Sequence, residues 1–230
     1  MKKKSKVNSG EFPEVILSFL AACLTFAQMS AGILSFQTII SKGNSIFRDR
    51  GSKFLGFCFP VNDREEIRNA LKHLKELHSK ANHHCYAWRL GVEGTEYRAS
   101  DNGEPSGSAG KPILGQIDSA GLTNVLVVVV RYFGGTLLGI PGLINAYKAA
   151  AGECLAVADK VEKEIRTRFQ LSFDYTLLND VMGHIRRLEA KIIKQDMALF
   201  CTYDIEVPLK NKMDFLSVAN NLYGLAFKAV

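Results

Sequence analysis

Between residues 36 and 159 the hydrophobic pattern alternates between the period of strands and the period of helices. Strand patterns, which alternate or are β-branched and aromatic, occupy residues 53–60, 85–91, 95–100 and 124–130. Helical spacing occupies residues 62–80, 111–120 and 139–157. The run 124–130 is almost entirely β-branched, so we expect a central strand with both faces buried. These elements predict an α+β fold in which helices form a layer on one sheet.

After residue 164 the pattern predicts a second, smaller unit. The predicted elements are strand 166–173, helix 177–188, strands 191–197 and 199–207, helix 211–223 and strand 225–230. This βαββαβ order is the ferredoxin-like order. The charged stretch 159–163 stands between the two patterns and predicts a boundary, which gives domains at 36–159 and 160–230.

The first 35 residues do not fit either pattern. Four lysines are followed by an uncharged run from Val15 to Phe36, 22 residues long, which is enough to span a bilayer. Polar residues dilute this run, and Met29 offers a second start that would remove most of it. We expect residues 1–35 to be a leader that is disordered or wrongly included, and the protein to be cytoplasmic. A membrane anchor at 15–36 is the alternative.

Charge and cysteine usage narrow the class of protein only slightly. The formal net charge of +6 is spread along the 230 residues, so contact with RNA or a ribosomal surface is allowed but not required. The five cysteines are scattered and lack CxxC spacing, which is typical of reduced, buried thiols in a cytosolic protein. The oligomeric state does not follow from these features.

The most informative stretch, residues 98–147, places two glycine-rich segments around the predicted central strand. Glycine is costly in backbone entropy, so such clusters indicate turns with positive φ or close backbone approach. A buried strand that leads into a glycine loop at a helix start is a common way to build an anion or backbone site. The candidate binding residues are Arg98, Asp101, Glu104, Ser106, Gly107, Lys111, Arg131, Tyr132, Gly134, Gly135, Gly139 and Gly142.

Arg131 has two interpretations. It ends an apolar strand, and a buried arginine needs a carboxylate partner, so a structural ion pair with Asp101 or Glu104 is one outcome. The other is a cradle for an anion or an RNA backbone, formed with Lys111 and the helix start at Gly139. The neighbouring aromatic residues allow either base stacking or a place in the core. They are Tyr132, Phe133 and Tyr147.

The usual cofactor and catalytic motifs do not fit. Pro105 and Pro112 break a phosphate loop at Gly110-Lys111, and no GxGxxG for a dinucleotide or GxSxG for a hydrolase is present. His83, His84 and Cys85 are adjacent on a predicted strand, so at most two point to one face for a metal or a Cys–His pair. We expect one buried hydrogen-bonding histidine, one exposed histidine and no cofactor.

Two motifs together carry a family resemblance. DNGEPSGSAGKPIL at 101–114 and NVLVVVVRYFGGTLLGIPGLINAYKAA at 124–150 closely resemble the IMPACT/YigZ family, with Ile140-Pro141 standing where small residues are expected. The resemblance covers about 47–158, and the C-terminal part resembles the second domain of bacterial members. It implies that the first domain has the fold of the second domain of the fifth small-subunit ribosomal protein, also seen in elongation factor G domain IV.

The resemblance also carries the functional expectation. Members of the IMPACT branch modulate the general-control response to amino-acid starvation through a partner protein, and the bacterial branch has no settled role. We therefore expect a non-enzymatic, translation-associated protein that contacts the ribosome, RNA or a translation factor, an inference from family likeness rather than from a site. The alternative is a peptidase-like hydrolase or an anion- or metal-binding enzyme that uses the glycine loops.

Overall fold

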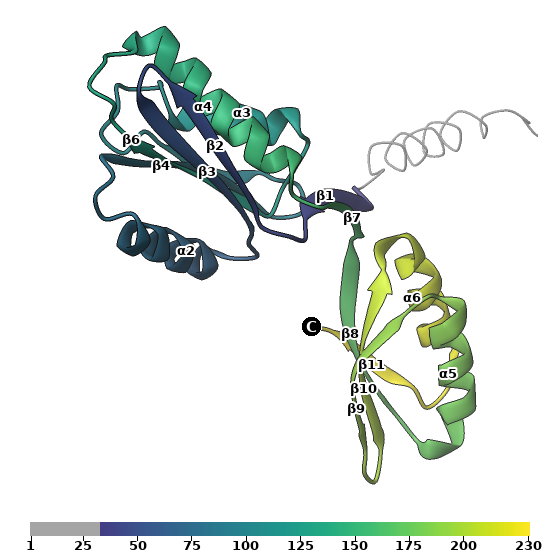
Figure 1. Ribbon diagram of the computed structural model, residues 1–230. Helices are drawn as coiled ribbons and strands as arrows, with labels where there is room; N and C mark the ends of the chain where they lie inside the picture. Colours follow the sequence, from purple (N-terminus) through teal and green to yellow (C-terminus); the bar gives the residue numbers. More distant parts are fainter. Residues whose placement is uncertain (1–32) are drawn as a thin grey trace, which may run out of the picture. The chain divides into compact units, whose positions relative to one another are not determined.

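The computed structural model describes residues 33–230 as a mixed α/β structure with several sheets, consistent with a two-domain α+β fold (Figure 1). The first ten elements are β1 (Ser35–Ile39), β2 (Gly43–Asp49), β3 (Ser52–Pro60), α2 (Arg64–Leu77), β4 (His83–Leu90), β5 (Glu96–Ser100), α3 (Gly110–Ser119), β6 (Val125–Tyr132), α4 (Gly139–Ala156) and β7 (Lys160–Glu164). Five of the strands form one sheet in the order β2-β3-β6-β4-β5.

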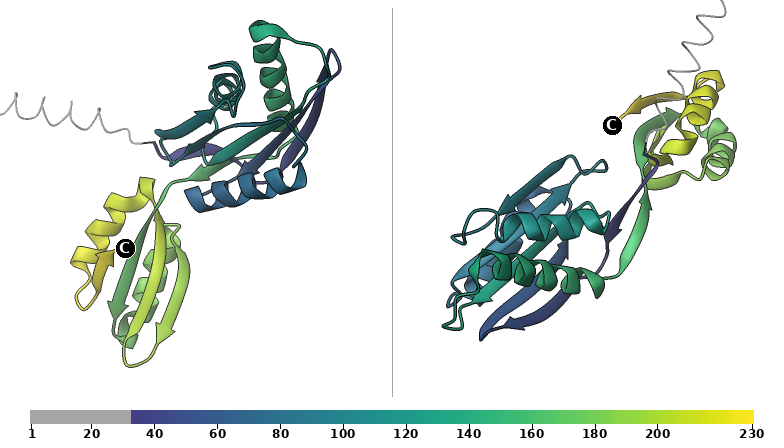
Figure 2. Two further views of the ribbon diagram at one scale, coloured as in Figure 1. Left: turned by 90° about the vertical axis from the view of Figure 1, so that its left-hand side faces the viewer. Right: turned by 90° about the horizontal axis from the view of Figure 1, so that it is seen from above.

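Strand β6 is the centre of this sheet, as its β-branched sequence predicts. Helix α2 covers one face, and α3 and α4 cover the other (Figure 2). Val127 and Val129 pack toward α3 and α4, whereas Val128 and Val130 pack toward α2. Because both faces are covered, the strand shows no alternation of polar and apolar residues.

The two crossover connections of this sheet have opposite hands. β3 and β4 are parallel and are connected by α2, and β5 and β6 are parallel and are connected by α3. Compared with the first crossover, the second starts from a strand that runs in the opposite direction, crosses the sheet in the opposite direction and has its helix on the opposite face. Each of these three reversals inverts the hand, so the two crossovers have opposite hands. One of the two is therefore left-handed, an exception to the strong preference for right-handed crossovers.

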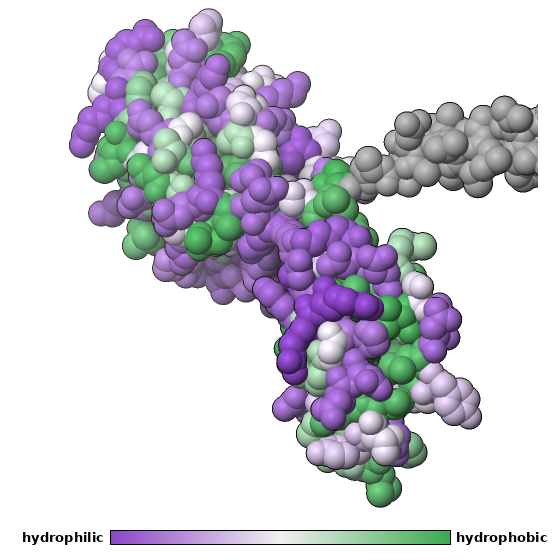
Figure 3. Space-filling view, turned by 90° about the vertical axis from the view of Figure 1, so that its right-hand side faces the viewer, coloured by the Kyte–Doolittle hydropathy of each residue, from purple (hydrophilic) through white to green (hydrophobic). Residues whose placement is uncertain are grey.

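The later elements have the predicted order. They are β8 (Arg166–Phe173), α5 (Leu178–Arg187), β9 (Lys191–Met197), β10 (Cys201–Pro208), α6 (Lys212–Asn221) and β11 (Ala226–Ala229). The sheet order is β11-β8-β10-β9, all antiparallel, and helices α5 and α6 contribute to a separate hydrophobic core with it. Leu199 and Phe200, in the β9–β10 turn, are exposed. Figure 3 shows one face of the molecule, on which hydrophobic residues (green) are scattered among hydrophilic ones (purple).

Three strands, β1, β2 and β7, lie outside the segments predicted as strands. The charged stretch expected as a boundary contains β7, which pairs antiparallel with β1 from Ser35↔Glu164 to Ile39↔Lys160. β2 is an edge strand of the large sheet. Edge and two-stranded segments bury little surface, so polar residues are allowed at most of their positions and the hydrophobic alternation is weak.

The expectations for the leader fall on residues 1–32, outside the described residues. Phe36, the last residue of the uncharged run, lies in β1. Within residues 33–230, none of the helices combines the length and apolar character needed to cross a bilayer.

Candidate functional site

Glu104 is the carboxylate partner of Arg131. One oxygen of Glu104 (Oε1) accepts hydrogen bonds from Arg131 Nη1 at 2.6 Å and from the Tyr147 hydroxyl at 2.7 Å. The side chains of Arg131 and Glu104 are 6% and 4% exposed. Arg131 and Glu104 thus form a buried ion pair, to which the neutral Tyr147 hydroxyl adds a third group. This corresponds to the structural ion pair considered for Arg131 from the sequence, and not to a cradle for an anion.

The guanidinium of Arg131 has further neighbours. Its Nη2 donates to Ser52 Oγ at 3.4 Å. Its carbon lies 5.4 Å from the ring centre of Phe54 and 5.6 Å from that of Phe133, within the range of cation–π attraction. Its Nε has no partner within residues 33–230. The cation is thus held between two rings and a carboxylate rather than presented to solvent.

This network joins the two glycine segments. Glu104 belongs to the first segment, Arg131 is the next-to-last residue of β6, which leads into the second, and Tyr147 is on the helix that follows. Ser52 adds a bond because its hydroxyl accepts from the backbone N–H of Gly134 at 3.2 Å. Both segments are therefore held in one arrangement by buried polar contacts.

Asp101 orders the first glycine segment instead of pairing with Arg131. Its carboxylate accepts from the backbone N–H groups of Gly107, Ala109 and Gly110 at 2.8–3.0 Å, at the N-terminus of α3. Burial alone would raise the pKa of this carboxyl, but the three N–H donors, together with Lys111, lower it below its usual value. Asp101 therefore acts as the cap of α3 in its ionised form.

We expect Asp101→Ala to lower the free energy of unfolding by about 0.5–2 kcal/mol at neutral pH, the range for removing a side chain that accepts from backbone N–H groups at a helix start. Because the folded-state pKa is lowered, this stabilisation is present above the unfolded pKa of about 3.9 and is lost as the pH falls through the folded value. Urea unfolding of both proteins at pH 7 and in acid measures the difference. A difference of equal size in acid would contradict the charged-cap role.

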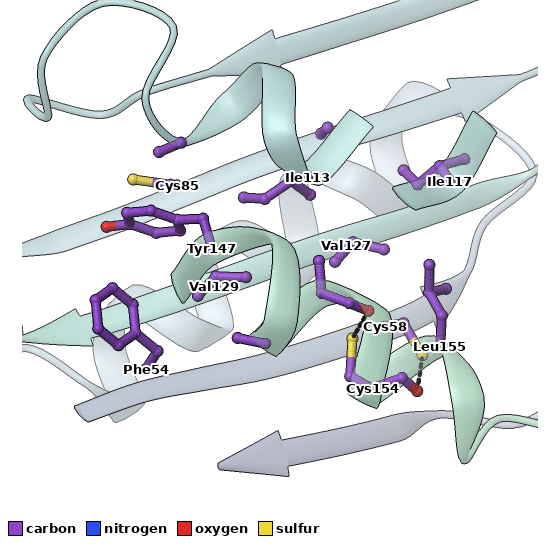
Figure 4. Packing of buried hydrophobic residues seen from close by; sticks show 14 of the residues in the cluster. Phe54, Cys58, Cys85, Ile113, Ile117, Val127, Val129, Tyr147, Cys154 and Leu155 are labelled. Carbon is purple, nitrogen blue, oxygen red and sulfur yellow. Dashed lines mark hydrogen bonds between the residues drawn. The ribbon is translucent and has the colours of Figure 1, made fainter. Parts of the chain in front are cut away.

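Cys85 is not an activated thiol. Its Sγ donates to the backbone oxygen of Asp101 at 2.9 Å, and it lies beside Tyr147 in the core (Figure 4). Burial raises the pKa of the Cys85 thiol to about 12, an effect that exceeds the opposing influence of the neighbouring Tyr147 hydroxyl. Burial also raises the pKa of the Tyr147 hydroxyl. At neutral pH both groups are protonated, so Cys85 is a packing residue with a weak hydrogen bond.

The histidines differ from the expectation in one respect. His83 and His84 point to opposite faces, as predicted for neighbours on a strand. The buried one, His84, has no partner at Nε2 among the described residues, and burial lowers its pKa. The hydrogen-bonding ring is that of the more exposed His83, whose Nδ1 is 2.9 Å from the Asn102 oxygen. Residues 33–230 contain no group of three metal-ligating side chains.

Two of the predicted site residues are not brought to this network. Arg98 is exposed on β5 and is the cross-strand neighbour of Trp88, which packs toward α2. Tyr132 also faces α2, and its hydroxyl lies 3.0 Å from His78 Nδ1. Both lie on the face opposite Arg131, because consecutive strand residues alternate between faces.

The remaining predicted residues lie in or beside the two segments. Ser106 and Lys111 are exposed. Positive φ angles occur at Gly107, Gly135 and Gly139. The closest packing occurs at Gly134, where an added Cβ would overlap the backbone of Gly51, and at Gly142, where it would lie 3.0 Å from Arg50 Nη2.

Two groups of this network carry no signal in the sequence. They are the Tyr147 hydroxyl, which donates to Glu104, and the Ser52 hydroxyl, which accepts from Arg131. Ser52 is 79 positions from Arg131 and reaches it through the pairing of β3 with β6. No local sequence pattern indicates such a contact. It could be inferred only if the pairing of β3 with β6 were known.

Known proteins resemble this chain both in sequence and in fold. Residues 50–155 match the family model of the Impact N-terminal domain. The chain is 31% identical over 166 residues to IMPACT family member YigZ of Escherichia coli, covering 71% of this chain and 81% of that protein. It is 33% identical over 152 residues to IMPACT family member YvyE of Bacillus subtilis, covering 66% and 70%.

Two further comparisons extend this result. Protein IMPACT of Oryctolagus cuniculus is 36% identical over 96 residues, which cover 40% of this chain and 30% of that protein. A crystal structure described as a hypothetical protein superimposes with a TM-score of 0.66 at 28% identity, covering 86% of this chain and 98% of the other. The protein has an α+β fold with several sheets. It is of the class of proteins that contain an Impact N-terminal domain. The chain belongs to the IMPACT family.

Proposed function

We propose that this protein is a non-enzymatic, translation-associated regulatory protein that works by binding the ribosome, RNA or a translation factor. Its relatives include proteins named IMPACT in eukaryotes as well as bacterial members of the family. The observation that carries the proposal is the pair of hydrogen bonds by which Glu104 holds Arg131 and Tyr147.

This network favours binding over catalysis. The charge of Glu104 is matched by Arg131 and its exposed area is small, so it is poorly placed to exchange a proton with a substrate. Cys85 is protonated and hydrogen-bonded within the core. The same bonds hold both glycine segments in position before any partner arrives, which lowers the entropy lost on binding.

The contact surface we propose is the outer side of the two glycine segments. Lys111 supplies an exposed cation, and Ser106 is exposed beside it. The second segment presents apolar side chains to solvent, with Phe133 46% and Leu137 83% exposed. A surface of this mixed kind suits a protein or ribonucleoprotein partner.

We also propose the finer fold likenesses. The left-handed crossover supports the fold of the second domain of the fifth small-subunit ribosomal protein for the five-stranded sheet, because few folds contain one. The βαββαβ order over 166–229, with sheet order β11-β8-β10-β9, supports a ferredoxin-like second domain.

Ribosome co-sedimentation at graded salt tests the function. We expect the full chain to sediment with ribosomes at low salt and to dissociate as salt rises, since surface cations carry the attraction. Lys111→Ala should weaken binding and flatten the salt dependence by about one charge. Lys228→Ala, which removes an exposed lysine of the four-stranded sheet, is the matched control and should change binding less.

Two results would overturn the proposal. One is the absence of co-sedimentation by the folded protein at the lowest salt. The other is peptidase or metal-dependent turnover that is abolished by substitution of His84, Cys85 or Glu104, since that would establish an enzyme.

A further inference from the structure

The opposite face of the five-stranded sheet carries a groove that the glycine segments do not explain. It lies between helix α2 and strands β4 and β5 and has a volume of about 400 Å³. Its floor consists of Ile67 and Leu71 from the helix and Tyr86 and Trp88 from β4. We call this hollow the α2 groove.

Arginines stand on both walls of the α2 groove. Arg64 and Arg68 belong to the helix, and Arg98 belongs to β5 on the other side. A second hollow of about 600 Å³ shares Arg68 and Leu71 with the first and continues along α2 past Lys72 and Lys75. The cations thus extend along the helix and are not confined to one point.

Most of these cations have no internal partner. Arg64 is paired with Glu96, whose oxygen lies 2.6 Å from its Nε. Within residues 33–230, the other four form no ion pair; they are Arg68, Lys72, Lys75 and Arg98. One further acid, Glu76, lines the second hollow. The surface is therefore positive and complementary to an anion longer than a single phosphate.

The spacing suits a polymer of phosphates. Arg68, Lys72 and Lys75 follow the i, i+4, i+7 pattern, so they lie on one helix face over about 10 Å. In a stacked strand of nucleic acid one phosphate occurs about every 3.4 Å along the helix axis, so this length of α2 corresponds to about three nucleotides of axial rise. On the floor, the half-buried Tyr86 provides a ring on which a base can stack.

We propose that the α2 groove binds single-stranded nucleic acid, with phosphates along Arg68, Lys72 and Lys75, Arg98 opposite them, and a base against Tyr86. Arginine suits this position because its planar group binds phosphate with two donors. An acidic protein segment would satisfy the cations but would not need an aromatic floor. This inference rests on the proposed function, since it names the ligand class of a second surface of the same binding protein.

Fluorescence anisotropy with a labelled 12-nucleotide oligo(U) and the full chain tests the groove. Arg68→Ala and Lys72→Ala should each reduce the slope of log affinity against log salt by about 0.7. Tyr86→Leu, which keeps an apolar side chain, should weaken binding about 5- to 150-fold, the effect of one lost stacking contact. Lys148→Ala is the matched control, because it removes an exposed lysine from α4 on the opposite face.

Three results would contradict the proposal that the α2 groove binds single-stranded nucleic acid. The first is that none of the three variants weakens oligo(U) binding while thermal melts show them folded. The second is that Lys148→Ala weakens it as much as Arg68→Ala. The third is that a polyglutamate peptide binds in a manner sensitive to Arg68→Ala while oligo(U) and oligo(dT) do not bind. Retained ribosome co-sedimentation in the same variants would show that only the groove assignment had failed, and not the proposed function.

Discussion

Arg131→Ala is expected to lower the free energy of unfolding by about 3–5 kcal/mol, the cost of leaving a buried charge without its partner. Glu104 is 4% exposed, so once Arg131 is removed its carboxylate has little access to water. The remaining neighbours of the carboxylate are the Tyr147 hydroxyl and the His83 ring, whose Nε2 lies 3.9 Å away, and neither replaces the bond that Arg131 donates at 2.6 Å. Urea unfolding followed by circular dichroism measures the loss.

Lys111→Ala is the control for this prediction. Lys111 is an exposed cation in the same region, and Asp101 beside it is held mainly by backbone N–H groups. Its removal should therefore change the free energy of unfolding by no more than about 0.5 kcal/mol. If Arg131→Ala were folded and destabilised by less than about 1 kcal/mol, Arg131 would not be a structural residue and the cradle interpretation would return.

Gly134→Ala is expected to be the second most damaging change, with a loss of about 1–3 kcal/mol or more from overpacking. A Cβ at Gly134 would overlap the backbone carbonyl of Gly51 and the amide nitrogen of Ser52, so the main chain would have to move. That movement would also break the bond from the Gly134 N–H to the Ser52 hydroxyl. Thermal melting should show a lower midpoint.

Gly115→Ala provides the matched comparison. Gly115 is within α3, and an added Cβ there meets no other atom within 4 Å. Alanine should therefore stabilise the helix by about 0.5–1 kcal/mol. Equal effects of the two substitutions would mean that the close approach of Gly134 to Gly51 does not constrain the chain.

Much of the fold could be predicted from the sequence. Long helices with one buried face show apolar residues at helical spacing, and a strand buried on both faces shows a continuous apolar run. The all-buried run of β6 and the helical spacing of α2 were both evident, and Asp63 caps α2 by accepting from two backbone N–H groups. The βαββαβ order was predicted for the same reason. Strands β1, β2 and β7 were missed, because they carry polar residues at most positions and owe much of their placement to strand pairing. Only single residues of β1 and β2, such as Ile39 and Phe47, pack in the core.

The candidate site was predictable only in part. That Arg131 needs a carboxylate follows from its place at the end of an apolar strand, since a charge cannot be buried alone. Which carboxylate it takes did not follow. Asp101 was an equal candidate, but the tight turn at the start of α3 directs three N–H groups to it. This leaves Glu104 for Arg131.

The sequence by itself therefore determined the types of residue present and the elements that carry them. Only the tertiary structure decided which of these residues share a face. Tyr132 is next to Arg131 in the sequence, yet it faces α2, since consecutive strand residues alternate between faces. Arg98, on β5, lies on the same α2 face. Ser52 reaches Arg131, and Tyr147 reaches its partner Glu104, from distant segments, because strand pairing and helix packing bring them together and local patterns do not record either.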